Sequence, residues 1–235
     1  MADATIAANL ESVRSRVDAA ARRAGRDPRD VLLVAVSKTF SADAVGSAWA
    51  AGHRDFGENK VQEALQKIAD TADKEIRWHL IGHLQSNKVR KAATAFACIQ
   101  SVDSVDLLER LDRAAAEQGA SPEVLVQVDL AGETTKFGAP ADQARRILDT
   151  ALAARAVRVA GLMLVPPWNE DQEQTRPWFR RLRALRDRWL GEGVAAPALR
   201  HLSMGMSHDF EAAIEEGATV VRVGTAIFGK RTVRA

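Results

Sequence analysis

The chain has little cysteine, little net charge and no long apolar run. Its single cysteine, Cys98, cannot form an internal disulfide, which argues against a disulfide-stabilised secreted domain. Its 33 basic residues nearly balance its 31 acidic ones, and a net charge of +2 gives no strong electrostatic case for binding nucleic acid or membrane. Charged residues interrupt every apolar stretch well before the roughly 18 residues of a membrane helix. The N-terminus also lacks a basic start followed by an apolar core, so we expect a cytoplasmic protein.

The length suits one α/β barrel. At 235 residues with 46% hydrophobic content, the chain can bury a sizeable core and is close to the roughly 250 residues of such a barrel. We therefore expect a single domain over residues 1–235. An apolar residue recurs every three or four positions near the N-terminus, which predicts a leading helix before the first strand. That stripe consists of Ile6, Leu10, Val13 and Val17.

Strand-like and helical patterns then alternate along the chain. The expected strands are 31–37, 54–57, 78–82, 97–102, 123–130, 157–165, 199–204 and 219–224. Eight such units predict right-handed parallel crossovers that close into a (β/α)8 TIM barrel with an extra N-terminal helix. The clearest helix is expected near 172–190, with its apolar face formed by Trp178, Leu182, Leu185 and Trp189. The arginines of this segment are interpreted as a solvated face.

Lys38 closes the first buried strand, where parallel barrels place their chemistry. A lysine there can simply reach solvent or pair with a carboxylate. Held among apolar walls near cationic groups, it would instead have a lowered pKa and could attack an aldehyde as a neutral amine. Arg222, expected to point inward from the eighth strand, could hydrogen-bond a pyridine nitrogen and discourage its protonation.

The loops after strands seven and eight are candidates for binding phosphate. The turn from Ser203 to Ser207 opens a helix, and Gly224 followed by Thr225 would let the backbone approach an anion closely. Glycine and serine turns are common in any α/β protein, so neither loop is persuasive alone. Their joint occurrence after the last two strands favours a phosphate cradle.

Eight motifs are spread over nearly the whole chain. They are Val34-Ala-Val-Ser-Lys-Thr39, Phe56-Gly-Glu-Asn59 with Val61-Gln-Glu63, Trp78-His-Leu-Ile-Gly82, Leu84-Gln-Ser-Asn-Lys88, Lys136-Phe-Gly138, Gly161-Leu-Met163, Leu202-Ser-Met-Gly-Met-Ser207 and Arg222-Val-Gly-Thr-Ala-Ile-Phe-Gly229. In this order they resemble the pyridoxal-phosphate homeostasis protein family. The resemblance implies a barrel like the N-terminal domain of alanine racemase, with pyridoxal 5'-phosphate bound covalently to Lys38 as a Schiff base.

The resemblance also assigns roles. It implies that the phosphate is held by Ser203, Ser207, Gly224 and Thr225. It places Arg222 at the pyridine nitrogen and Asn59 near the ring. Lys60 and Leu164-Val165 depart from the family's usual residues, which could alter access to the ring.

The function implied is that of a carrier rather than an enzyme. It would buffer pyridoxal 5'-phosphate and deliver it transiently to apo enzymes, and other B6 vitamers are further candidate ligands. The alternative is a cofactor-dependent racemase or decarboxylase with weak activity. A two-base racemase of this barrel type needs a tyrosine opposite the lysine, and the sequence contains none. We expect no nucleic-acid partner, no membrane and a monomer.

The remaining reactive side chains suggest no second site. His79, His83 and His201 have no strong metal-binding spacing, and we expect no metal. His79 is expected to pack or hydrogen-bond, and Cys98 to be an inert buried thiol.

Overall fold

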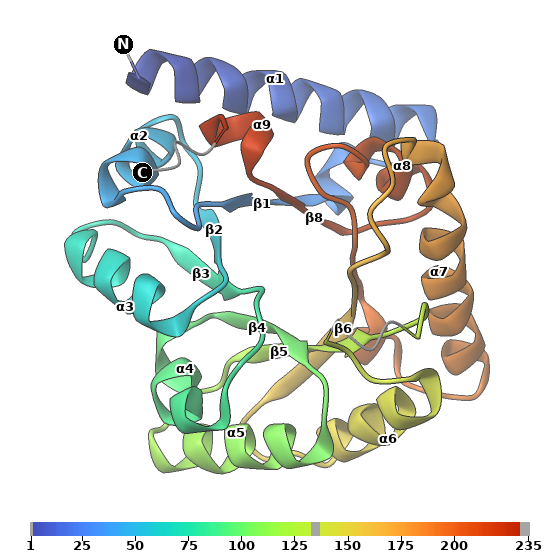
Figure 1. The fold of residues 1–235 in the computed structure, drawn as a ribbon. Coiled ribbons are helices and arrows are strands. Elements are labelled where there is room, and N and C mark those ends of the chain that lie inside the picture. The colour runs from blue at the N-terminus through green and yellow to red at the C-terminus, as the bar shows by residue number, and fades with distance from the viewer. Residues whose placement is uncertain (1, 133–136, 231–235) are drawn as a thin grey trace.

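The computed structural model describes residues 2–132 and 137–230, with side chains from Ala4 onward. Eight parallel strands form a closed barrel in sequence order, and β1 pairs with both β2 and β8 (Figure 1). The strands are β1 (Leu32–Val36), β2 (Asp55–Glu58), β3 (Arg77–Leu80), β4 (Cys98–Val102), β5 (Glu123–Val128), β6 (Arg158–Leu164), β7 (His201–Ser203) and β8 (Val220–Val223).

Helices surround the barrel (Figure 1). They are α1 (Ala2–Arg23), α2 (Ala42–Ala50), α3 (Val61–Asp70), α4 (Val89–Ala95), α5 (Val105–Glu117), α6 (Ala141–Leu152), α7 (Arg176–Gly191), α8 (Phe210–Glu215) and α9 (Thr225–Phe228). Single 3-10 turns lie at Pro28–Asp30, Ser86–Lys88, Gln172–Gln174 and Ala196–Leu199. The predicted barrel with an extra N-terminal helix is confirmed, and all eight expected strands overlap the observed ones.

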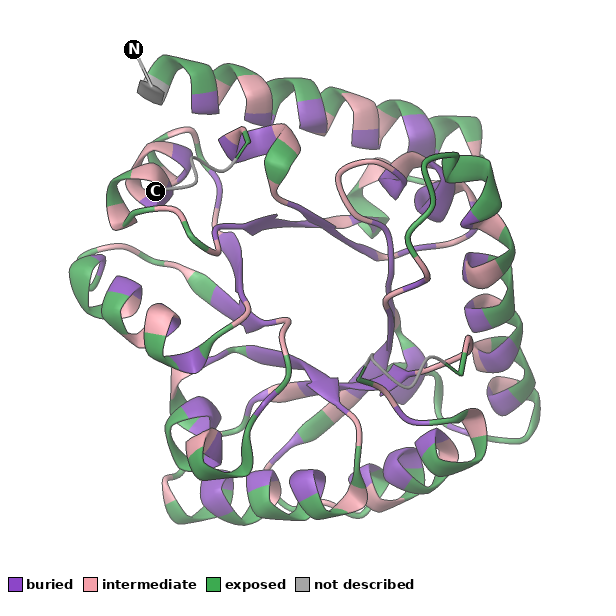
Figure 2. Ribbon diagram, in the orientation of Figure 1, coloured by how far each residue is buried: buried purple, intermediate pink, exposed green. Residues whose placement is uncertain are grey.

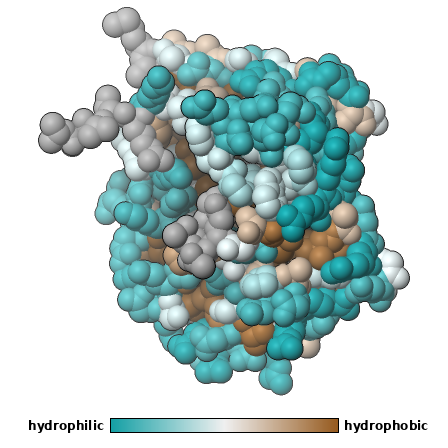
Figure 3. Space-filling view, turned by 45° about the vertical axis from the view of Figure 1, so that its right-hand side comes forward, coloured by the Kyte–Doolittle hydropathy of each residue, from teal (hydrophilic) through white to brown (hydrophobic). Residues whose placement is uncertain are grey.

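Burial explains this arrangement. The strands are buried almost throughout, and the helices bury their inward stripes while exposing the opposite faces (Figure 2). On the face shown in Figure 3, hydrophilic residues predominate and hydrophobic ones form separate patches. Side-chain caps fix where helices begin: Ser41 accepts from the backbone N–H of Ala44, and Ser104 accepts from that of Leu107.

One predicted helix face needs correction. In α7 the buried residues are Phe179, Leu182, Leu185 and Trp189, so Phe179 takes the place that we predicted for Trp178. Positions 178 and 179 lie about 100° apart on a helix, and the buried stripe falls on the second of them. Trp178 is only half-buried, and the guanidinium of Arg181 lies 4.7 Å from its ring centroid.

Helix α1 lies beside the junction between the first and last strands. Its amide Asn9 Nδ2 donates to the backbone oxygen of Ile227 at 3.0 Å, and Arg16 forms a paired contact with Glu211 at 3.0 and 2.9 Å. Arg26 donates to the backbone oxygens of Ile214 and Ala218. The leading helix therefore anchors α8 and α9, which flank the predicted phosphate loops. No helix in the described ranges is both long and apolar enough to cross a membrane.

Candidate cofactor-binding site

A cavity of about 870 Å³ brings together most of the predicted site residues at one end of the barrel. Lys38 follows β1, Ser207 follows β7, Gly224 and Thr225 follow β8, and Arg222 lies within β8. The other lining residues are Val36, Ile81, Trp168, Glu170, Met206, His208 and Ala226. The cavity lies at the carboxyl ends of the strands, where barrels of this kind carry their ligands.

Lys38 enters the cavity because side chains alternate along the end of β1. Val36 and Lys38 line the cavity, whereas Ser37 between them is fully buried and donates a hydrogen bond to Glu58 at 2.6 Å. Thr39, the next residue, has φ of 70°, in the left-handed region. This tight turn ends the strand and sets the direction of the lysine.

The predicted phosphate loops meet at a close backbone approach. The N–H of Gly224 donates to Ser207 Oγ at 3.1 Å. A Cβ on Gly224 would lie 3.2 Å from the backbone oxygen of Val36, so only glycine fits there without displacement. Thr225, directly after Gly224, adds a hydroxyl to the cavity wall. Hydroxyl and backbone N–H donors are therefore close together at this end of the cavity, as a phosphate requires.

A second glycine shapes the loop that carries Ser207. Gly205 has φ of 95°, and a Cβ there would lie 2.6 Å from that of Ala213. Its backbone oxygen accepts a hydrogen bond from the N–H of Arg222 at 3.0 Å, which ties the loop after β7 to β8. Both the conformation and the contact with Ala213 require glycine.

Arg222 is a buried cation beneath the cavity mouth. Its guanidinium donates to Ser203 Oγ at 2.5 Å and to the backbone oxygen of Leu164 at 2.9 Å. Burial lowers the pKa of Arg222 to about 10, and the nearby carboxylate of Asp209 acts in the opposite direction. The guanidinium is therefore protonated at neutral pH and held in one orientation.

A hydrogen-bonded chain continues from Arg222 through the barrel interior. Ser203 Oγ donates to Oε1 of Gln100 at 2.6 Å, and Nε2 of Gln100 lies 3.2 Å from Nδ1 of His79. His79 Nε2 lies 3.1 Å from a carboxylate oxygen of Asp55, which also pairs with Arg77. The expectation that His79 packs or hydrogen-bonds is confirmed.

Asp55 lies near the end of this series of hydrogen bonds, and its pKa is below the usual value. Burial opposes ionisation of Asp55, but hydrogen bonds from His79 and Arg77 lower its pKa to about 2. The carboxylate is thus ionised at neutral pH.

Two predicted residues lie away from the cavity lining. Ser203, expected to contact phosphate, is fully buried and bonded to Gln100 and Arg222. Asn59, expected near the ring, lines a separate hollow of about 330 Å³ beside Gly82. A Cβ on Gly82 would lie 2.3 Å from the backbone oxygen of Asn59, so glycine permits this contact between the two loops. Lys136, part of one family-like motif, lies outside the described residues.

The structure adds cavity residues that sequence reasoning missed. Trp168 is 68% exposed at the cavity wall, and Glu170 and His208 are titratable groups beside it. Nε2 of His208 is buried without a hydrogen-bond partner among the described residues. An aromatic residue after Pro166-Pro167, directly beyond the sixth strand, was the available signal for Trp168. Cys98 is buried as expected, and burial raises the pKa of its thiol.

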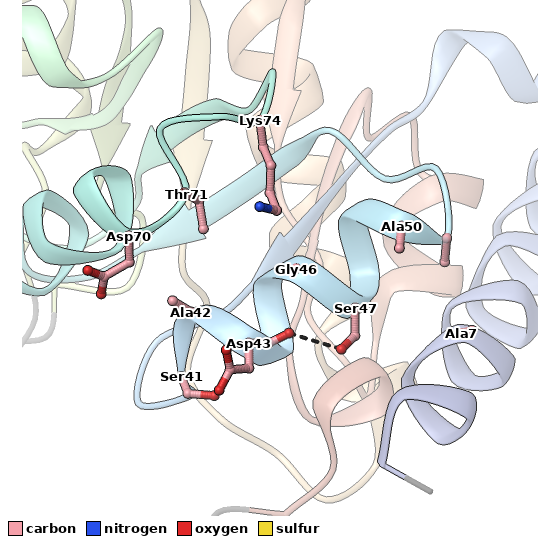
Figure 4. A pocket seen from close by; sticks show the side chains of 11 residues that line it. Ala7, Ser41, Ala42, Asp43, Gly46, Ser47, Ala50, Asp70, Thr71 and Lys74 are labelled. Atoms are coloured by element: carbon pink, nitrogen blue, oxygen red, sulfur yellow. Dashed lines mark hydrogen bonds between the residues drawn. The ribbon is translucent and has the colours of Figure 1, made fainter.

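A larger hollow of about 1000 Å³ lies outside the barrel, between α1, α2 and the end of α3 (Figure 4). Lys74 and Thr71 extend toward its α2 wall, where Ser47 donates to the backbone oxygen of Asp43 at 2.9 Å. It contains none of the predicted cofactor residues. Most of the predicted cofactor residues instead line the cavity at Lys38.

Comparison with known proteins defines the class of this barrel. The family model for the N-terminal domain of alanine racemase matches residues 8–232. An alanine racemase structure from Clostridium difficile 630 has a TM-score of 0.73 at 14% identity, over 98% of this chain and 58% of that chain, and supports the fold alone. The fold and the cavity thus define a barrel of the alanine racemase N-terminal class.

More similar proteins narrow the class. The pyridoxal phosphate homeostasis protein of Pseudomonas aeruginosa is 44% identical over 228 residues, 97% of this chain and 96% of the relative. That of Aquifex aeolicus is 41% identical over 223 residues, 94% of this chain and 96% of the relative. PipY of Synechococcus elongatus PCC7942, solved with PLP bound, has a TM-score of 0.84 and 42% identity over 95% of this chain and all of that chain. The chain belongs to the pyridoxal phosphate homeostasis protein family.

Proposed function

We propose that this protein binds pyridoxal 5'-phosphate in the cavity at Lys38, carries it as a Schiff base and delivers it to apo enzymes. The observation that carries the proposal is the meeting of a lysine amine, a buried guanidinium and two hydroxyl-bearing loops in one cavity. Its volume of about 870 Å³ is within the roughly 300–1,000 Å³ of small-molecule sites. The residues present therefore fit the group. The bound cofactor would supply a reactive aldehyde and an electron-withdrawing ring.

The two ends of the cavity have different tasks. Ser207, Gly224 and Thr225 would hold the phosphate through hydroxyl and backbone donors, and Lys38 would hold the aldehyde carbon. Arg222 would donate to the pyridine nitrogen. A permanent cation at this nitrogen disfavours its protonation, which weakens the ring as an electron sink and suits storage better than turnover.

The positions of Ser203 and Asn59 support a revised assignment. Ser203 would orient Arg222 by accepting its hydrogen bond, and would contact no phosphate. Asn59 would shape the neighbouring loop through its backbone contact with Gly82. Neither residue would touch the cofactor directly.

Two functions need to be distinguished: delivery of the cofactor to apo enzymes, and catalysis on amino acids. His208 and Glu170 line the same cavity and are its candidates for a second acid or base, which keeps weak racemase or decarboxylase activity as the alternative. The missing tyrosine favours the carrier. We further propose that residues 1–235 act as one domain, as a monomer and in the cytoplasm.

The deciding experiment is reduction of the purified, cofactor-loaded protein with borohydride. Peptide mapping should place the pyridoxyl group on Lys38, and a visible absorption band should disappear on reduction. Predominant labelling of Lys136 or Lys230 would overturn the assignment. Delivery is tested separately, by mixing the loaded protein with an apo enzyme directly or across a dialysis membrane. Faster reactivation in the mixed sample is expected if handover requires contact.

A further inference from the structure

The turn that carries Lys38 is held from outside the barrel by a buried lysine. Lys67, on α3, is only 5% exposed. Its ammonium donates to the backbone oxygen of Ser37 at 2.7 Å, to Oε1 of Glu58 at 2.6 Å and to Oε1 of Glu63 at 2.9 Å. An ammonium has three N–H groups, so all of its donors are used. We call Glu58, Glu63 and Lys67 the outer clamp.

The two carboxylates of the outer clamp bind the residues on either side of Lys38. Ser37 Oγ donates to Oε1 of Glu58 at 2.6 Å, and the backbone N–H of Thr39 donates to Oε1 of Glu63 at 2.5 Å. Thr39 has φ of 70°, a strained conformation for a β-branched residue that persists only where surrounding contacts hold it. The hydrogen bond to Glu63 is such a contact.

The outer clamp buries charged groups, and removing such groups from water costs free energy. Glu58 is fully buried, and its Oε2 has no hydrogen-bond partner among the residues that the structure describes. Burial raises the pKa of Glu58, although hydrogen bonds from Lys67 and Ser37 act against that rise. Apolar side chains of similar volume often give equal or greater stability than a buried ion pair. Stability alone therefore does not account for the outer clamp, whereas orientation of the attached turn does.

We propose that Glu58, Glu63 and Lys67 are positioning residues that fix the Ser37–Thr39 turn, so that the Lys38 amine meets the cofactor's aldehyde carbon. This inference rests on the proposed function. In the step concerned, the amine nitrogen forms a bond to the aldehyde carbon and the carbonyl oxygen leaves as water, taking both protons of the neutral amine. The outer clamp acts on this step and not on phosphate binding, because its contacts go to the turn after β1 and not to the loops after β7 and β8.

The test compares two ligands in the full-length protein. Pyridoxal 5'-phosphate can form the covalent bond, whereas 4'-deoxypyridoxine 5'-phosphate has the same ring and phosphate but no aldehyde. Glu63→Ala should weaken binding of the aldehyde by about tenfold, as for the loss of a charge-assisted hydrogen bond, and leave the analogue within about twofold. Glu63→Gln keeps an acceptor oxygen and should restore most of the loss. Lys67→Met should repeat the selective loss and slow borohydride trapping.

The controls separate three outcomes. Lys74→Met removes an ion pair with Asp73 that lies away from the Ser37–Thr39 turn. This variant should change the affinity for neither the aldehyde nor its deoxy analogue. Equal loss for both ligands in Glu63→Ala would show a merely structural role and overturn the proposal, as would no loss in either. The unmodified protein is trapped first. Labelling away from Lys38 in that sample would overturn the proposed function together with the outer clamp's role, before any variant is compared.

Discussion

Arg222 donates a hydrogen bond of 2.5 Å to Ser203, and both side chains are buried inside the barrel. The same serine hydroxyl donates onward to Gln100. One hydroxyl therefore connects the cation beneath the cavity to the polar chain in the barrel interior. Ser203 could either support Arg222 or contact phosphate. A substitution would lower the stability of the fold in the first case and the affinity for phosphate in the second.

Ser203→Ala should destabilise the fold by about 1 to 3 kcal/mol, because it leaves a buried guanidinium N–H and the Gln100 oxygen without their partner. The free energy of unfolding in urea measures this change. Ser207→Ala, in the cavity wall, should cost less stability and more affinity for phosphate-bearing ligand. The reverse pattern, with Ser203→Ala stable but defective in phosphate binding, would restore the sequence-based assignment.

Removing phosphate from the ligand should weaken binding strongly. Hydrogen bonds to a charged group contribute about 1.5 to 3 kcal/mol each. The loss of two of them therefore predicts that pyridoxal binds about 100-fold more weakly, or weaker still. Thr225→Ala should lose less than this, since the backbone donors remain. Titration of both vitamers, followed by absorbance, provides the measurement. Similar affinities for the two would contradict the phosphate cradle.

Gly205→Ala should destabilise the protein by about 2 kcal/mol or more, because the new methyl group meets Ala213 and the backbone has positive φ. Gly52→Ala is the matched control, since Gly52 also has positive φ but no atom within 4 Å of its added Cβ. Thermal unfolding of both variants distinguishes steric conflict from backbone strain. Equal losses would assign the whole effect to the backbone.

Acid should remove the contribution of Asp55. Its folded pKa of about 2 lies below the ordinary value of 3.8, so its stabilisation is present above pH 3.8 and is lost as pH falls toward 2. The stabilisation is about 2 kcal/mol when fully present. The difference in unfolding free energy between the native protein and Asp55→Asn should shrink between pH 4 and pH 2.

His53 loses its contribution at higher pH than Asp55. Burial lowers its pKa from 6.5 to about 4, so protonation below pH 6.5 favours the unfolded chain. Asp55→Asn retains this histidine and the backbone oxygen that it contacts, so the difference between the two proteins removes most of the His53 contribution and leaves that of Asp55 together with its Coulomb attraction to His53. A constant difference across the acid range would contradict the assignment.

Amino-acid turnover should be slow. With the amine of Lys38 on one wall and Arg222 disfavouring a protonated ring, we expect racemisation or decarboxylation below about 1 per second for each amino acid in a panel. His208→Ala and Glu170→Gln should reduce any residual activity if either side chain acts as a second base. Faster turnover that these variants abolish would favour the enzyme over the carrier.

Periodicity predicted the barrel because each strand is a short apolar run between polar loops, a pattern that burial on both faces produces directly. It also located Lys38 just after the first strand and Arg222 within the eighth, where the structure has them, while their roles toward the cofactor stay predictions. Ser203 was harder. Alternation along β7 indicates an inward side chain, but depth within the barrel depends on the stagger of neighbouring strands.

The contacts of the outer clamp could not be predicted from periodicity. Lys67 has the sequence surroundings of an ordinary solvated helix residue, and its burial depends on a turn some 30 residues earlier in the chain. The shift from Trp178 to Phe179 has a similar origin, because adjacent aromatic residues fit one helical stripe almost equally well. Contacts between distant segments decide both cases.

The register of the closing strands sets when the site can exist during synthesis. Val34 on β1 pairs with Arg222 on β8, so the site spans the seam where distant parts of the chain meet. A chain emerging from the ribosome presents Lys38 after the first strand, but the guanidinium and the residues proposed to hold phosphate emerge only with the seventh and eighth strands and the loops after them. Such a nascent chain has an amine without an anchor. Anchored cofactor capture would therefore require a closed barrel, and a chain truncated before β8 would lack Gly224 and Thr225 among the residues proposed to hold the phosphate.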